Sequence, residues 1–175
     1  MKHIFILLVS VVLISCGSTV AVDYEKNTDF TSQKTFQFYE PERTGLNELD
    51  IKRVETAIDN VLAQKSWQRT DYNQFFISFY VENLGEARRN TIGVGLGSGG
   101  GGISVGGGVG IPIGARKYSQ KLTIQINKAT ENQPLVWEGS LEGELKENAT
   151  PKEKEKHFNS MVAKILSKFP PETKE

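Results

Sequence analysis

Hydrophobic and polar residues alternate along five segments of the chain in the manner of half-buried β-strands. Because successive side chains of a strand point to opposite faces, each segment predicts one apolar face and one polar face. In the last segment Leu135, Trp137 and Leu141 fall on the predicted buried face. Strands of this kind are typical of an antiparallel sheet that is covered on one side. The segments are 20–24, 35–39, 75–82, 121–127 and 135–145.

Two further segments repeat apolar residues at the spacing of one buried helix face. Asn47 is a good N-cap for the first helix, which we expect to end near Ser66. Thr150 and Glu153 form the capping-box pattern at the start of the second helix, and Pro170 ends it. The chain is therefore predicted to fold as an α+β two-layer sandwich, in which two amphipathic helices cover a mainly antiparallel sheet.

Glycine dominates residues 93–114, which hold 12 of the 17 glycines of the chain. Two arms of alternating apolar residues and glycine flank a Ser-Gly-rich centre. They predict either a disordered loop or a hairpin that extends the sheet. Gly95, Gly97 and Gly100 have the spacing of the dinucleotide fingerprint, but that motif needs a helix that opens within it. No helix-forming run follows, so we predict no cofactor site here.

The chain begins with the hydrophobic pattern of a bacterial export signal. Lys2 and His3 precede an apolar run over residues 4–13, which is too short to span a membrane as a helix. The run closes with Leu13-Ile14-Ser15-Cys16. A small residue followed by cysteine at this place resembles the lipobox of bacterial lipoproteins.

The lipobox resemblance implies cleavage between Ser15 and Cys16 and addition of a diacylglyceryl group to the Cys16 sulfur. Residues 1–15 are then the signal peptide, and 16–19 are the lipidated N-terminus and a short tether. Aspartate at the second position retains enteric lipoproteins in the inner membrane, whereas Ser18 stands there in this chain. We therefore expect an anchor in the outer membrane, on its periplasmic face, rather than in the inner membrane.

The charge balance and the cysteine count exclude several classes of function. The sequence has 21 basic and 21 acidic residues, so it lacks the concentrated positive charge that nucleic-acid binding needs. Cys16 is the one cysteine, and its acylation would leave no thiol for a disulfide or a thiolate metal site. We predict no nucleic-acid partner, no metal site and no cofactor.

Candidate catalytic residues are few. The predicted mature chain has one histidine, His157, which we interpret as a solvated helix residue rather than a general base. Glu138, Glu142 and Glu144 share one face of a predicted strand, where acidic side chains are typically solvated. Paired carboxylates of the glycosidase type carry no local signature, so they stay an open alternative. The sequence predicts no enzyme and no catalytic residue.

Short motifs are spread over most of the chain: Asp23-Tyr24, Thr28-Asp29-Phe30, Lys34-Thr35-Phe36, Leu135-Val136-Trp137-Glu138-Gly139 and Phe169-Pro170-Pro171. Together they resemble the DUF4136 family of bacterial envelope lipoproteins over about residues 22–171. This resemblance implies one α+β domain over 20–171, and we expect residues 172–175 to be a disordered tail. The resemblance assigns no catalytic or ligand residues.

We therefore predict a lipid-anchored periplasmic lipoprotein with a non-enzymatic binding or scaffolding role. Its partners would be the bilayer, through acylated Cys16, and an envelope protein. The alternative is a binding protein for a small apolar or lipidic ligand, with Phe76, Tyr80 and the glycine-rich arms along a groove. A third class is a hydrolase of cell-wall or lipid substrates that acts through paired acids.

Overall fold

The computed structural model describes residues 19–39, 44–87, 91–93, 110–112 and 114–171. The calls on Ser15, Cys16 and the 172–175 tail lie outside these residues. Within them the chain forms eight strands and two helices: β1 (Ala21–Tyr24), β2 (Thr35–Phe38), α2 (Glu48–Gln64), β3 (Gln68–Arg69), β4 (Phe75–Glu86), β5 (Thr91–Gly93), β6 (Gly110–Pro112), β7 (Lys117–Lys128), β8 (Leu135–Lys146) and α3 (Pro151–Leu166).

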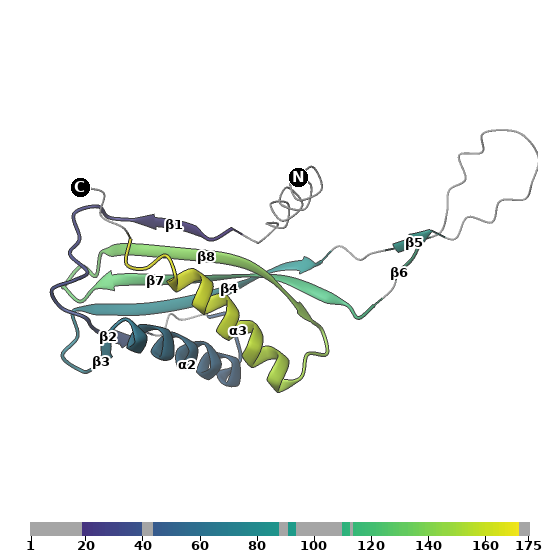
Figure 1. Ribbon diagram of the computed structural model, residues 1–175, viewed down its shortest axis with the longest axis horizontal. Coiled ribbons are helices and arrows are strands. Elements are labelled where there is room, and N and C mark those ends of the chain that lie inside the picture. The colour runs from purple at the N-terminus through teal and green to yellow at the C-terminus, as the bar shows by residue number, and fades with distance from the viewer. Residues whose placement is uncertain (1–18, 40–43, 88–90, 94–109, 113, 172–175) are drawn as a thin grey trace, which may run out of the picture.

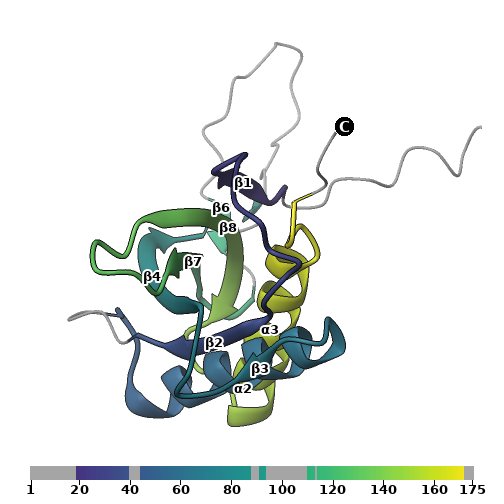
Figure 2. The same cartoon turned by 90° about the vertical axis from the view of Figure 1, so that its left-hand side faces the viewer.

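Six of the strands form one open sheet in the order β1-β8-β7-β4-β2-β3. The pairs β1–β8, β8–β7 and β7–β4 are antiparallel, whereas β2 runs parallel to both β4 and β3. Helices α2 and α3 lie side by side against one face of this sheet (Figures 1 and 2). The predicted α+β two-layer sandwich is confirmed, and the sheet is mixed at the β2–β3 edge.

Both helices begin where their capping residues predict. The Asn47 side chain accepts a hydrogen bond from the Asp50 backbone N–H at 3.0 Å, which caps α2. At the start of α3, the Glu153 N–H donates to the Thr150 hydroxyl, and the Glu153 carboxylate accepts from the Thr150 N–H. These bonds satisfy backbone donors that a helix leaves without partners in its first turn.

The core lies between the helices and the inner face of the sheet. Phe169, just beyond α3, packs its ring against the rings of Phe30, Trp67 and Trp137 at centroid distances of 5.1–5.3 Å. Both tryptophans are buried, Trp137 as the strand pattern predicted. This aromatic cluster joins the first loop, the end of α2, strand β8 and the C-terminal segment.

The predicted burial of Leu135 is wrong. Residues Ile126 and Asn127 of β7 pair with Trp137 and Leu135, so Val136 is an extra residue in β8. Such a β-bulge reverses the alternation at its position. Val136 is therefore buried, while Leu135 is 47% exposed.

Gly139 and Gly143 of β8 allow a close approach of helix α3. A methyl group at Gly139 would lie 2.8 Å from Cγ2 of Ile165 and would also meet the Trp137 ring. At Gly143 it would lie 3.0 Å from both Cε1 of His157 and Sδ of Met161. The β8 backbone therefore lies directly against the side chains of α3.

The two arms of the glycine-rich segment pair as a short antiparallel hairpin. Thr91 pairs with Pro112, Ile92 with Ile111 and Gly93 with Gly110. This hairpin is a separate two-stranded sheet beyond the ends of β4 and β7 (Figure 1), so it does not extend the main sheet as one prediction held. Residues 94–109 lie outside the described part of the chain.

Candidate functional site

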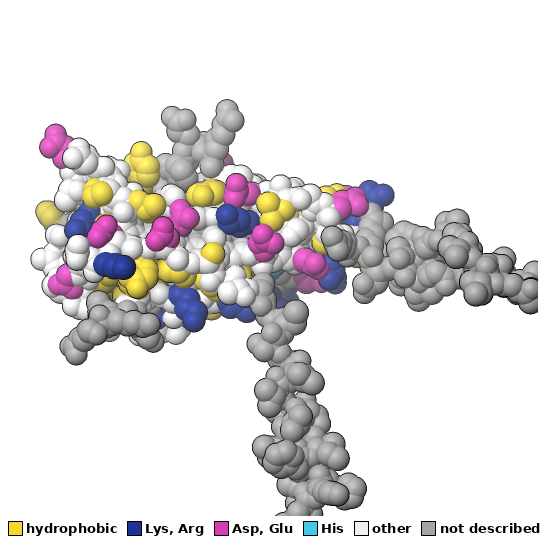
Figure 3. Space-filling view, turned by 90° about the horizontal axis from the view of Figure 1, so that it is seen from above, with side chains coloured by type: hydrophobic (Ala, Val, Ile, Leu, Met, Phe, Trp, Pro, Cys, Tyr) yellow, Lys and Arg dark blue, Asp and Glu magenta, His cyan; other side chains and the backbone are white. Residues whose placement is uncertain are grey.

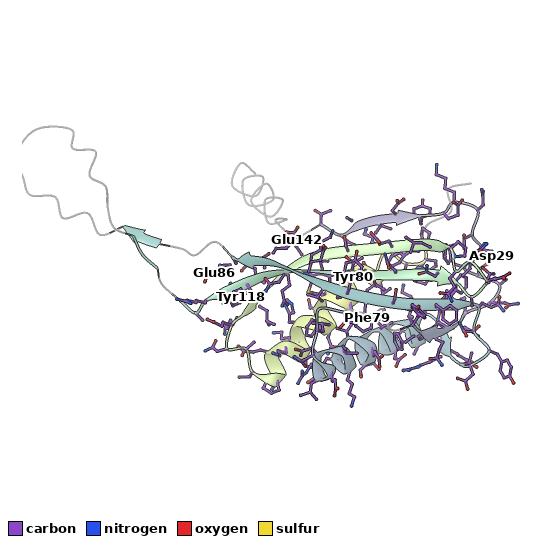
Figure 4. The ribbon with its side chains drawn as sticks, turned by 180° about the vertical axis from the view of Figure 1, so that it is seen from behind. Asp29, Phe79, Tyr80, Glu86, Tyr118 and Glu142 are labelled. Atoms are coloured by element: carbon purple, nitrogen blue, oxygen red, sulfur yellow. The ribbon has the colours of Figure 1, made fainter. Side chains whose placement is uncertain are left out.

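The acidic residues that the sequence singled out share the outer face of β8. Glu142 and Glu144 also line the groove between β8 and α3 that is described below. The Glu138 carboxylate accepts a hydrogen bond from Nε2 of Gln125 at 2.8 Å. Glu144 forms an ion pair with Lys117 at 3.0 Å. Glu142 is exposed on the same face as Tyr80 of β4 (Figure 4). Each of the two partnered carboxylates therefore has its own neighbour, and neither pairs with the other.

Phe76 and Tyr80 also lie on this outer face, whereas Phe79 points to the helices (Figure 4). Phe76 packs near the ring of Tyr39, at a centroid distance of 6.1 Å. Neither of the two grooves described below is lined by Phe76 or Tyr80. The predicted role of the glycine-rich arms in a ligand groove depends on side chains outside the described part of the chain.

His157 is not the solvated residue that the sequence predicted. Its ring packs against Phe158 at a centroid distance of 5.3 Å and against the backbone of Gly143. Its Nε2 atom is buried without a hydrogen-bond partner in the described residues. Burial lowers the pKa of the imidazole, so His157 is neutral at pH 7.

A groove lies between the second half of β8 and α3, with a volume of about 490 Å³. We call it the β8–α3 groove. Leu141, Gly143 and Met161 supply its apolar part, and Lys156 and Lys164 are two of the charged residues at its rim. This volume falls within the range of small-molecule sites. Within the described ranges, no cluster of three or more His, Cys, Asp or Glu residues is arranged to hold a metal ion.

A second groove lies beside the edge strand β1, with a volume of about 600 Å³. We call it the β1 groove. Its walls are β1 and the C-terminal segment, and Lys65 at the end of α2 also lines it. Its full lining is Val20, Val22, Tyr24, Lys65, Ser167, Lys168, Phe169, Pro170 and Pro171.

No pattern in the sequence indicates the β1 groove. Strand β1, the end of α2 and the terminal Phe169-Pro170-Pro171 are each visible in the sequence, but only as separate elements or family motifs. No local pattern showed that Lys65 and Lys168, a hundred residues apart, lie on one surface with β1. Only the packing of both helix ends beneath β1 brings these residues together.

The sequence matches the family described as "Domain of unknown function (DUF4136)" over residues 20–171. The chain belongs to the DUF4136 family. The match spans β1 to the end of the described C-terminal segment and so includes both grooves. No curated protein matches the chain in sequence.

Two solved structures of low sequence identity share the fold. A PDZ domain protein from Parabacteroides distasonis is 13% identical with a TM-score of 0.55, over 89% of this chain and 36% of that one. PelC from Paraburkholderia phytofirmans, a dodecamer, is 13% identical with a TM-score of 0.50, over 86% of this chain and 95% of that one. The DUF4136 chain thus spans about a third of the first protein and nearly all of PelC.

None of the helices in the described residues combines the length and the apolar character that crossing a membrane requires.

Proposed function

We propose that this DUF4136 protein is a lipid-anchored lipoprotein of the bacterial envelope with a non-enzymatic binding or scaffolding role. The observation that carries this proposal is the Leu13-Ile14-Ser15-Cys16 motif, which stands four residues before the start of the family match at residue 20. One acyl chain holds a protein to a bilayer only marginally, but two or more anchor it stably. A lipobox product with a diacylglyceryl group meets that requirement.

The short connection limits where the domain works. Between Cys16 and Val20 the chain reaches at most roughly 14 Å, even when fully extended. The domain would therefore stay beside the bilayer, which suits the recruitment of a partner at the membrane surface. Neither Gly17 nor Ser18, the two residues after the cysteine, is aspartate. We therefore propose an anchor in the outer membrane, facing the periplasm.

Two observations favour binding over catalysis. His157, the one histidine of the proposed mature chain, is packed against Gly143 with its Nε2 atom buried, so it is poorly placed to act as a general base. Glu138 and Glu144 are each engaged by a different neighbour, Gln125 and Lys117. A carboxylate pair would need two of these groups to face one substrate.

Replacement of the lipidated cysteine tests the proposal. In cells fed labelled palmitate, the wild-type chain is expected to incorporate the label and to lose residues 1–15. Cys16→Ser is expected to incorporate no label and to keep the signal sequence. Gly17→Asp combined with Ser18→Asp serves as the matched control, because aspartate at both positions after the cysteine should leave acylation intact but retain the protein in the inner membrane. A Cys16→Ser protein that is processed and fractionates as the wild type does would refute the anchor.

Cross-linking in intact cells tests the scaffolding role. PelC, which shares the fold, is a dodecamer, so copies of this chain are one form that the partner can take. Mass spectrometry of the cross-linked products distinguishes copies of the same chain from other envelope proteins. Recovery of neither class from cells that make the acylated protein would contradict a scaffolding role.

The second candidate function is the binding of a small apolar or lipidic ligand. The β8–α3 groove favours it, because apolar Leu141 and Met161 lie next to Lys156 and Lys164 in a space of about 490 Å³. Native mass spectrometry of the gently purified protein should show an added mass if such a ligand is resident. Met161→Arg is expected to remove that mass, whereas Asn159→Arg, on the exposed side of α3, should leave it unchanged.

A further inference from the structure

Among the strands that the structure describes, β1 ends the six-stranded sheet and pairs on one side only, with β8. Sheet edges of this kind are normally shortened, charged or covered, because their free backbone groups attract other molecules. All four residues of β1 are exposed, and among them Val22 and Tyr24 are 36% and 39% exposed. The β1 edge is therefore open to contact with another molecule or surface.

The two faces of β1 differ in charge. Val22 is paired with Gly139 and Tyr24 with Trp137, so both share the inner face with the β1 groove. Asp23 is paired with Glu138 on the outer face. Acidic groups thus lie on one side of the strand and the apolar groove on the other.

Positive charge accompanies the apolar side chains in the β1 groove. Lys65 and Lys168 both line it, and its other lining residues carry no charge. Neither lysine forms an ion pair within the ranges that the structure describes. Such a combination suits the surface of a lipid bilayer. The two lysines can bind the anionic phosphates of the headgroups, and the valine, tyrosine and proline side chains can contact the acyl chains beneath them.

The position of the proposed anchor points to the same surface. Val20, at the start of the groove, is four residues from Cys16, a reach of at most roughly 14 Å. The C-terminal segment from Ser167 to Pro171 lies beside β1 on this side of the molecule (Figures 1 and 2). The view from above shows hydrophobic side chains interspersed with both basic and acidic ones (Figure 3).

We infer that the β1 groove is the surface on which the anchored domain lies against the bilayer, with Lys65 and Lys168 binding phospholipid phosphate. This inference rests on the lipid anchor of the proposed function and adds an orientation to it. Val20, Val22 and Pro171 contact the boundary between headgroups and acyl chains. The acidic outer face of β8 and the N-terminal ends of both helices then lie away from the bilayer, where a partner can reach them.

Site-directed labelling of the acylated protein in vesicles tests this orientation. Cys16 is the one cysteine, and acylation would consume its thiol, so an introduced cysteine is the one reactive thiol. Ser167→Cys places a fluorophore in the groove. Tyr72→Cys is the matched control, because Tyr72 is 91% exposed and follows β3 at the opposite edge of the sheet. The vesicles contain phosphatidylethanolamine, phosphatidylglycerol and a nitroxide-labelled lipid as quencher.

The label at position 167 is expected to be quenched about twofold more strongly than the label at position 72, because it lies at the lipid surface. Equal quenching at the two positions, in protein that is acylated and floats with the vesicles, would overturn this inference and leave the anchor intact. Disulfide formation between the position-167 cysteines of unlabelled protein, together with no quenching of the labelled protein, would assign the groove to a second copy of the chain and would also overturn the inference. Protein without acyl mass would instead refute the anchor, and the inference with it.

Charge reversal gives a second readout. Lys65→Glu combined with Lys168→Glu should lower the quenching at position 167 about twofold, since the groove would repel phosphate. Lys52→Glu combined with Lys152→Glu makes the same change in net charge on exposed helix positions outside the groove. This control pair should leave the quenching unchanged. The inference fails if both pairs have the same effect.

Discussion

Asp50 is the one charged side chain among the described residues that is buried, with 5% exposure. Its carboxylate forms ion pairs with Arg53 in α2 at 2.6 Å and with Lys154 in α3 at 3.0 Å. The side-chain amide of Asn47 donates a further hydrogen bond to it. Burial raises the pKa of Asp50, but the hydrogen bonds from Lys154, Arg53 and Asn47 outweigh it and hold the pKa below its ordinary value.

Asp50→Ala is expected to lower the free energy of unfolding by about 2 kcal/mol, because it removes three partners of a buried group. Since the folded pKa is depressed, the stabilisation is complete above about pH 4 and is lost as the pH falls through the folded pKa. Urea unfolding at pH 7 and pH 3 should show a smaller difference between variant and wild type in acid. Equal differences at the two pH values would contradict the role of the ionised carboxylate.

Gly139→Ala tests the close contact between β8 and α3 at a single position. The added methyl group would meet Ile165 and the Trp137 ring, both fully buried, so we expect a loss of about 1–3 kcal/mol in unfolding free energy. Gly143→Ala is the matched control, because its nearest neighbours are the side chains of His157 and Met161, which have more room to move. A loss at Gly143 as large as that at Gly139 would argue against this difference in packing.

At the scale of elements, helix α3 depends on the capping box at its start. Hydrogen bonds from Lys146 and from the backbone and hydroxyl of Thr150 lower the pKa of Glu153 to about 2. The ionised carboxylate therefore stabilises α3 above about pH 4, and this contribution is lost as the pH falls toward the folded pKa. The cap thus joins the end of β8 to the first turn of α3.

Thr150→Ala is expected to cost about 1 kcal/mol of unfolding free energy, as is typical for an N-cap. Glu153→Gln should keep the hydrogen bonds to Thr150 but lose the ion pair with Lys146. Its stability should then depend less on pH than that of the wild type between pH 5 and pH 2. Thermal unfolding followed by circular dichroism across this range measures both effects, and parallel pH profiles for Glu153→Gln and the wild type would contradict the second.

At the scale of the whole molecule, Phe169 holds four distant segments together through its contacts with Phe30, Trp67 and Trp137. Phe169→Ala should therefore lower the free energy of unfolding by about 3–5 kcal/mol, the usual cost of a large cavity. Tyr72→Ala, at a residue with 91% exposure, should change it by less than about 0.5 kcal/mol. Denaturant unfolding of the two variants gives the comparison, and similar values would show that the cluster is not central to stability.

The local elements of this protein are encoded by residues close together in the chain. Asn47 and Thr150 start the helices because each side chain accepts a hydrogen bond from the backbone N–H three residues further on. The alternation in β4 and β7 follows from the strand backbone itself, which turns successive side chains to opposite faces. The lipobox resemblance at Cys16 is equally local. For these features the amino-acid order is sufficient.

Tertiary structure alone determined the remaining features, because they depend on which segments become neighbours. Leu135 and Val136 exchanged places when β8 paired with β7 through a bulge, although the alternation predicted the opposite. His157 is half-buried because the backbone of Gly143, which carries no side chain, lies against its ring. The β1 groove exists because the ends of two helices pack beside an edge strand. Local periodicity in the sequence cannot predict contacts between segments so far apart in the chain.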